Sequence, residues 1–238
     1  MKKRVKRALK YAFEAPAPLS KELFLRSLPQ PRCGGRTFVL SQVGYIPLWV
    51  WSISFVTFLI ALFSVHYVRK DILGILSACI PFVASSAVAE NGKSMIYRMA
   101  ELEKASLFSL RSVALARLGI IGFSHLILLC LLSPLAAIGS LTSTLQAGVY
   151  LLLPYLLTTW LSLVFTRRSH SRDTSYLCMG TAVMISGLCV MTQSKFYLIY
   201  RPEYFHCWVV LTAVLLTLTA LGYYGTIKRT EELSWNLF

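Results

Sequence analysis

The stretch Ile72–Ala89 reads ILGILSACIPFVASSAVA, 18 consecutive residues without a charged side chain. Such a length fits a short transmembrane helix, whereas a strand in a soluble domain is usually about 5–6 residues long. The whole chain has the same character, because 56 % of its 238 residues are hydrophobic and only 14 % are charged. Soluble domains carry about 25 % charged residues. The sequence therefore predicts an integral membrane protein.

Five further apolar runs accompany this stretch along the chain. Together they predict an all-α, polytopic fold with six transmembrane helices, at about 45–65, 72–89, 113–132, 147–165, 174–191 and 207–224. The fifth run is poorer in large apolar residues and contains Gly180 and Gly187, so the sequence leaves open whether it is one continuous helix. The domain organisation predicted is a basic N-terminal segment (1–44), a transmembrane domain (45–226) and a short C-terminal tail (227–238).

The distribution of Lys and Arg predicts the orientation of these spans. Of the 24 basic residues, all but Arg69, Lys70, Lys195 and Arg201 fall on the side that holds the N-terminus and the C-terminus. Cytoplasmic segments carry the excess of Lys and Arg in membrane proteins. Both termini are therefore expected in the cytoplasm, with the protein in the plasma membrane. The formal charge of +14 is explained by this topology, and a nucleic-acid partner is not needed.

The N-terminus begins with a basic amphipathic pattern, MKKRVKRALKYAF. On a helix, its apolar side chains gather on one side and its basic side chains on another, which is typical of a helix lying on a membrane surface. The residues expected to meet anionic lipids are Lys2, Lys3, Lys6, Arg7 and Lys10. Ser20–Leu28 has the pattern of a second short helix, and a disordered basic arm is the alternative for the whole tail.

The segment between the second and third spans, residues 90–111, reads ENGKSMIYRMAELEKASLFSLR. It is too polar to cross a bilayer, yet its apolar residues recur at helical spacing. The sequence predicts a cytoplasmic helix that docks into a soluble partner, with a helix resting on lipid as the alternative. Mixed charges on its polar side, and Glu103 at the edge of the apolar stripe, favour the docking interpretation. The residues expected to bind the partner are Glu90, Met95, Arg98, Met99, Glu101, Leu102, Glu103 and Lys104.

No constellation in the sequence predicts catalysis, a metal site or a cofactor. The letters GKS at residues 92–94 end a phosphate-binding loop in ATPases, but Ala87 stands where such a loop needs its first glycine, and a membrane span precedes it. Ser124 and His125 are adjacent, so on a helix they point about 100° apart. The six cysteines and four histidines are dispersed, without a C-x-x-C or H-x-x-x-H pair. We expect His125 to be a hydrogen-bonded packing residue inside its span, although a polar residue there is also a functional candidate.

Small residues within the spans predict where helices approach closely. Gly180, Ser186 and Gly187 of the fifth span are candidates, as are Thr158, Thr159 and Ser162 of the fourth. The segment 133–146 is expected to be a loop.

In outline the chain resembles the membrane subunits of ABC-2-type exporters. The matching features are the basic amphipathic start, Glu90 at the close of the second span, Gly92 and Ser94 after it, the helix around residues 95–107, and Arg111 before the third span. The resemblance implies that a separate ATP-binding cassette ATPase subunit grips the coupling-type helix 90–111. It also implies a homo- or heterodimeric membrane partner. On this interpretation the chain is not itself an enzyme, since its partner hydrolyses ATP.

A function of another class is also compatible with the sequence. The N-terminal 44 residues have Leu-rich, helical pieces that suit a docking element. The alternative function is a membrane-bound regulator, similar to an anti-sigma protein, whose tail holds a cytoplasmic factor.

Overall fold

The structure is a computed structural model that describes residues 34–67, 72–96, 110–139, 143–168, 174–195 and 204–235. Within these ranges it describes all side chains except those of residues 91–96, 110–111, 139, 194–195 and 229–235. The chain divides into two units, Met1–Phe38 and Val39–Phe238. The six long helices all belong to the second unit.

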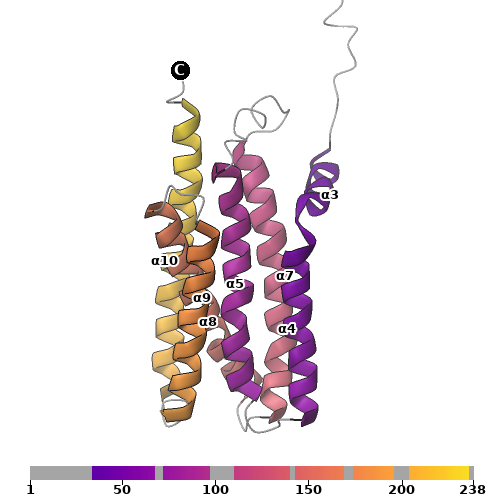
Figure 1. The fold of residues 1–238 in the computed structure, drawn as a ribbon, viewed down its shortest axis with the longest axis vertical. Helices are drawn as coiled ribbons and strands as arrows, with labels where there is room; N and C mark the ends of the chain where they lie inside the picture. Colours follow the sequence, from indigo (N-terminus) through magenta and orange to yellow (C-terminus); the bar gives the residue numbers. More distant parts are fainter. Residues whose placement is uncertain are drawn as a thin grey trace, which may run out of the picture. The chain divides into compact units, whose positions relative to one another are not determined.

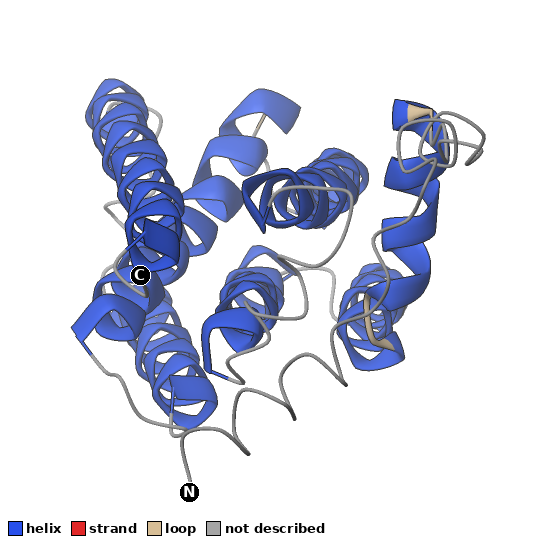
Figure 2. Cartoon of the chain, turned by 90° about the horizontal axis from the view of Figure 1, so that it is seen from above, coloured by secondary structure: helices blue, strands red, loops and turns tan. Residues whose placement is uncertain are grey.

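The described residues form helices and no strands (Figures 1 and 2). These helices are α3 (Gly35–Tyr45), α4 (Leu48–Tyr67), α5 (Ile72–Ile96), α7 (Leu110–Gly139), α8 (Thr144–Arg168), α9 (Thr174–Lys195) and α10 (Phe205–Trp235). In this described part, all except α3 are long and apolar enough to cross a membrane. The predicted all-α, multi-pass membrane architecture is confirmed.

Membrane-length windows fall close to the predicted spans. They run over Leu48–Tyr67, Ile72–Glu90, Ser112–Ile138, Thr144–Arg168, Thr174–Gln193 and Phe205–Lys228. The fifth span is one continuous helix, which answers the question that its glycines left open. The expected loop 133–146 is wrong over most of its length, because α7 continues to Gly139 and α8 begins at Thr144. Helix α3 was not predicted, since the Gly34–Gly35 pair reads as a break.

Three of the long helices contain a proline, namely Pro81 in α5, Pro134 in α7 and Pro154 in α8. Proline removes a backbone hydrogen bond, but membrane helices tolerate it where neighbouring groups bond to the freed backbone. At Pro154 the group that loses its helical donor is the Tyr150 carbonyl, one turn earlier in α8. The bounds of α5, α7 and α8 nevertheless run past their prolines. These helices therefore continue through their prolines.

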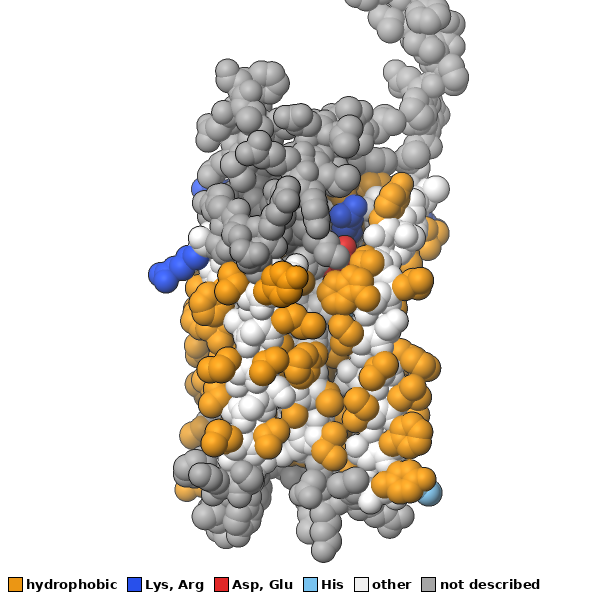
Figure 3. Space-filling view, in the orientation of Figure 1, with side chains coloured by type: hydrophobic (Ala, Val, Ile, Leu, Met, Phe, Trp, Pro, Cys, Tyr) orange, Lys and Arg blue, Asp and Glu red, His pale blue; other side chains and the backbone are white. Residues whose placement is uncertain are grey.

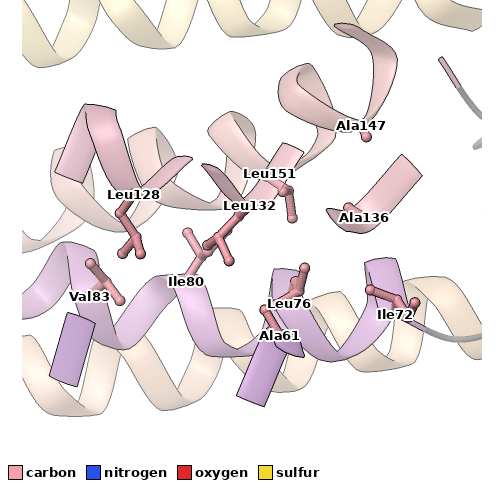
Figure 4. Close-up of a cluster of buried hydrophobic side chains, with 10 residues drawn as sticks. All are labelled: Ala61, Ile72, Leu76, Ile80, Val83, Leu128, Leu132, Ala136, Ala147 and Leu151. Atoms are coloured by element: carbon pink, nitrogen blue, oxygen red, sulfur yellow. The ribbon is translucent and has the colours of Figure 1, made fainter. Parts of the chain in front are cut away.

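Helix α5 lies at the centre of the bundle and packs against α4, α7, α8 and α9. Of its span, 67 % is buried, against 44 % or less for each of the other described spans. Its inner residues form the largest apolar cluster with side chains of α4, α7 and α8 (Figure 4), namely Ala61, Ile72, Leu76, Ile80, Val83, Leu128, Leu132, Ala136, Ala147 and Leu151. Helix α10 is more peripheral and packs mainly against α8.

Of the small residues that the sequence suggested for close helix contacts, those of α8 lie at such contacts and the two glycines of α9 do not. A Cβ atom added at Gly180 or Gly187 would meet nothing within 4 Å, and both glycines are exposed. Helix α9 instead turns a stripe of buried side chains inward, consisting of Thr174, Cys178, Ala182 and Ile185. The prediction for α8 holds better, since Thr158, Thr159 and Ser162 are buried, and the Ser162 and Thr181 hydroxyls hydrogen-bond at 2.9 Å.

Glycines that do mark close approaches lie at the two ends of the bundle. A Cβ atom at Gly74 of α5 would overlap the side-chain amide of Gln193 in α9. That amide also donates to the Ser77 hydroxyl at 3.4 Å. At the other end, Gly222 of α10 leaves room for Leu163, and Gly225 leaves room for the Arg167 guanidinium.

Candidate functional site at the end of α5

Glu90 lies where the second span ends, and its side chain is 8 % exposed. We call this side of the bundle the Glu90 end; α5, α8 and α10 finish there, and α4, α7 and α9 begin there (Figure 1). Glu90 does not open a new helix. Helix α5 continues through it without interruption to Ile96, six residues beyond the apolar span.

The two ends of the predicted coupling-type helix 90–111 therefore belong to two different helices, α5 and α7. Its first seven residues, including Glu90 and the backbone of Met95, belong to α5, and its last two belong to α7. The expected partner-binding residues Arg98, Met99, Glu101, Leu102, Glu103 and Lys104 lie outside the described residues, as do Lys2, Lys3, Lys6, Arg7 and Lys10. The structure thus describes the two ends of the segment, which belong to α5 and α7, and not residues 97–109 between them.

Two apolar clusters enclose the last turn of the span in α5. Ala87 packs with Ile46 from the bend before α4, with Val50 of α4 and with Ile121 of α7. Val88 and Ala89 pack with Leu163 and Cys178, which come from α8 and α9. The Trp49 side chain packs against both clusters. The end of the α5 span is therefore packed against residues of α4, α7, α8 and α9, and Glu90 is the next residue.

Arg117, whose role the sequence left open, projects from α7 toward α3. Its Nε donates to the Gln42 Oε1 at 3.3 Å, across 75 residues of sequence. Gln42 is the buried residue of α3, with 7 % exposure. Gln42 is not among the predicted residues, because a single glutamine in a polar tail gives no signal of burial.

Arg167 makes a similar link between α8 and α10. Its Nη2 donates to the carbonyl of Gly222 and its Nε to the Thr226 hydroxyl at 3.3 Å. The guanidinium fills the space that a side chain at position 225 would occupy. Arg167 is therefore more than a basic residue at the membrane boundary, because it also links two helices.

The Glu90 end holds several charged side chains that the structure describes. Of those described from Val39 onward, the Lys and Arg side chains are Arg117, Arg167, Arg168 and Lys228, and all lie in the helix turns at this end. Glu90 is the acidic one in this described set. Figure 3 shows basic and acidic atoms together at the upper border of a surface that is otherwise covered by apolar side chains.

His125 lies deeper in the bundle, 1 % exposed, between α7 and α8. Its Nδ1 is 3.2 Å from the Tyr155 hydroxyl, and the two rings meet edge to face with centroids 5.9 Å apart. The expected hydrogen-bonded packing is thus found at one nitrogen. The other nitrogen, Nε2, is buried without a hydrogen-bond partner among the described residues.

In the part of the chain that the structure describes, no group of three His, Cys, Asp or Glu side chains is placed to hold a metal ion. What this end holds is a buried carboxylate on the central helix α5, together with two arginines that each bond to a neighbouring helix. Comparisons of the chain with protein-family models, with curated proteins and with solved structures give no match.

Proposed function

We propose that this chain is the membrane subunit of an ATP-driven exporter, moved through residues 90–111 by a separate ATPase subunit. The observation that carries the proposal is the position of α5. It is the most buried of the described spans, it contacts four neighbouring helices, and it extends beyond the apolar span to Ile96. A force applied to residues 90–111 would therefore act on the centre of the bundle.

The path of that force follows from the contacts at the Glu90 end. Ala87 shares a cluster with α4 and α7, while Val88 and Ala89 share one with α8 and α9. Because packed cores shift between discrete arrangements and do not deform continuously, a displacement of α5 moves its neighbours as well. Work is coupled only when the ATP-bound and ATP-free partners hold the segment differently. Helix α5, which is buried and contacts four neighbours, could pass such a difference on to the rest of the bundle.

The orientation supports a cytoplasmic partner. Of the 24 Lys and Arg residues, all but Arg69, Lys70, Lys195 and Arg201 fall on the side of the Glu90 end, and Lys and Arg mark the cytoplasmic side of membrane proteins. An ATPase in the cytoplasm would meet α5 and α7 there.

The experiment is co-purification of the full chain from native membranes, followed by measurement of ATP hydrolysis. We expect an ATP-binding cassette subunit to co-purify, and the double variant Glu101→Lys/Glu103→Lys to lose it. The matched control is Glu231→Lys/Glu232→Lys, which reverses two charges in the C-terminal tail and should retain the subunit.

Two results would contradict the proposal. One is cross-linking of residues 95–107 to phospholipid alone throughout turnover. The other is release of a transcription factor when residues 1–31 are deleted while the spans stay assembled, which is the outcome expected of a membrane-bound regulator.

A further inference from the structure

Helices α8 and α10 pack against each other and run in the same direction, since both end at the Glu90 end. Arg167 fixes their relative position there, because its guanidinium bonds to the Gly222 carbonyl and the Thr226 hydroxyl and lies beside Gly225. Residues that flank this contact on α8 therefore keep a defined place relative to those that flank it on α10.

Two exposed basic side chains flank the contact, Arg168 on α8 and Lys228 on α10. Each residue turns a helix by about 100°, so Arg168 is rotated about 100° from Arg167 in the sense of the chain. By the same rule Lys228 is rotated about 60° from Gly225 in the opposite sense. Opposite rotations away from the shared contact of two parallel helices open on the same side of the pair. The two cations therefore lie on one face of α8 and α10.

The same face is apolar below the cations. Val164 precedes Arg168 by four residues, and Tyr224 and Leu221 precede Lys228 by four and seven residues, which are spacings that share one side of a helix. Tyr224 and Leu221 are each 66 % exposed. Arg168 and Lys228 are the last residues of the two membrane-length windows. The cations thus lie at the headgroup level, with a tyrosine and an apolar strip on the membrane side of them.

A phospholipid carries its groups in the same order, with a phosphate in the headgroup and acyl chains beneath it. A lipid-facing surface is covered by lipid in any case, so what these side chains select is the headgroup. Each basic side chain near the membrane surface favours an anionic lipid about fivefold. The acidic side chain described from Val39 onward is that of Glu90, which is buried on α5, while the side chains of Glu231 and Glu232 lie outside the described part.

We propose that Arg168, Lys228 and Tyr224 bind the headgroup phosphate of an anionic phospholipid, whose acyl chain lies along Val164 and Leu221. The two cations supply the charge, and the Tyr224 hydroxyl supplies a hydrogen-bond donor. Lys228 also interacts with another group of the chain, so we expect Arg168 to contribute more. This site goes beyond the proposed function, because it requires neither an ATPase nor a transported substrate.

The test measures which lipid lies beside position 221 in the full-length protein. Leu221→Cys, introduced after the natural cysteines are replaced, carries a bimane label in nanodiscs that contain equal amounts of phosphatidylglycerol and phosphatidylcholine. A doxyl quencher is placed on the acyl chain of one lipid or of the other. Quenching should show phosphatidylglycerol enriched about fivefold beside the label. Val210→Cys is the matched control position, because it lies on the same face of α10 toward the other end and is 62 % exposed.

Substitutions then assign the enrichment to the site. Arg168→Gln/Lys228→Gln should bring the ratio of the two lipids beside position 221 close to one, while Arg168→Lys should retain the enrichment and position 210 should not respond. Lys2→Gln/Lys3→Gln removes the same charge elsewhere and should have no effect at position 221. Inorganic phosphate at constant ionic strength should not displace the lipid, because a free anion lacks the acyl chain.

Three results would overturn the site. They are equal quenching by the two lipids in the wild-type background, an equal loss of enrichment in Lys2→Gln/Lys3→Gln, and displacement of the lipid by inorganic phosphate, which would indicate a site for a soluble anion. Since no ATPase is present in the nanodiscs, none of these results depends on the co-purification that tests the proposed function.

Discussion

His125 and Tyr155 form a polar pair inside the bundle in which only one nitrogen of the imidazole is bonded. The Nδ1 of His125 lies 3.2 Å from the Tyr155 hydroxyl, and Nε2 has no hydrogen-bond partner among the described residues. A buried polar group without a partner costs about 1–3 kcal/mol, whereas replacing both partners by apolar groups is close to neutral. This asymmetry makes the pair testable.

Tyr155→Phe should lower the free energy of unfolding by about 1–2 kcal/mol, because it leaves both nitrogens of His125 without a partner. The double variant His125→Leu/Tyr155→Phe should be more stable than Tyr155→Phe alone. Thermal unfolding of the purified protein in detergent measures both. Tyr176→Phe is the control, since the Tyr176 side chain is 79 % exposed. Additive losses in the double variant would show that the two residues do not stabilise one another.

The space beside Gly225 of α10, which the Arg167 guanidinium occupies, gives a second prediction. Gly225→Ala places a methyl group where the guanidinium lies, so Arg167 must leave its bonds to Gly222 and Thr226. We expect a loss of about 1–2 kcal/mol in unfolding free energy, the cost of two hydrogen bonds from a charged donor after discounting for partial exposure.

The control for this variant is Gly180→Ala on the open face of α9, where an added methyl group meets nothing within 4 Å. It should be neutral or slightly stabilising, because alanine is the better helix former. In an Arg167→Ala background, Gly225→Ala should cost nothing further. An equal loss of unfolding free energy for Gly225→Ala in both backgrounds would mean that Arg167 does not occupy the space beside Gly225.

These glycines also show that the sequence predicts the spans but not which face of each helix is buried. The spans were predictable, because about 18 apolar residues in a row have few other uses. The helix faces were not, since lipid and the bundle interior are both apolar and leave no polar face to mark the outside. Gly180 and Gly187 therefore looked as suitable for close packing as Gly222 and Gly225, although only the second pair lies at a helix contact.

The Glu90 end was predictable in part for a related reason. A carboxylate at the close of a span is conspicuous in a sequence with 10 acidic residues. The partners of Arg117 and Arg167 were not visible, because both bond to neutral groups far along the chain, a carboxamide in one case and a carbonyl and a hydroxyl in the other. Only the packing of the helices brings those groups together.

Close packing between α8 and α9 can be tested at Ser162, which is fully buried and bonded to Thr181 at 2.9 Å. Ser162→Ala should cost about 0.6 kcal/mol, the typical value for a hydrogen bond between membrane helices. Ser162→Leu should cost about 1–3 kcal/mol, because the larger side chain overpacks the contact. Ser52→Leu, at an exposed position of α4, is the size-matched control and should leave the melting temperature unchanged. A benign Ser162→Leu would contradict the close approach of the two helices.

The direction in which the Glu90 end faces is the prediction on which the proposed function depends. The described basic side chains of the second unit lie at that end, and the positive-inside rule assigns such an end to the cytoplasm. Single cysteines at Arg168 and Lys228, introduced after the natural cysteines are replaced, should react with a membrane-impermeant thiol reagent only once the membrane is opened. Cysteines at His66 and Tyr204, at the opposite end of the spans, should react in intact cells. The reverse labelling pattern would place Glu90 outside the cell, where no ATPase of the cytoplasm can reach α5.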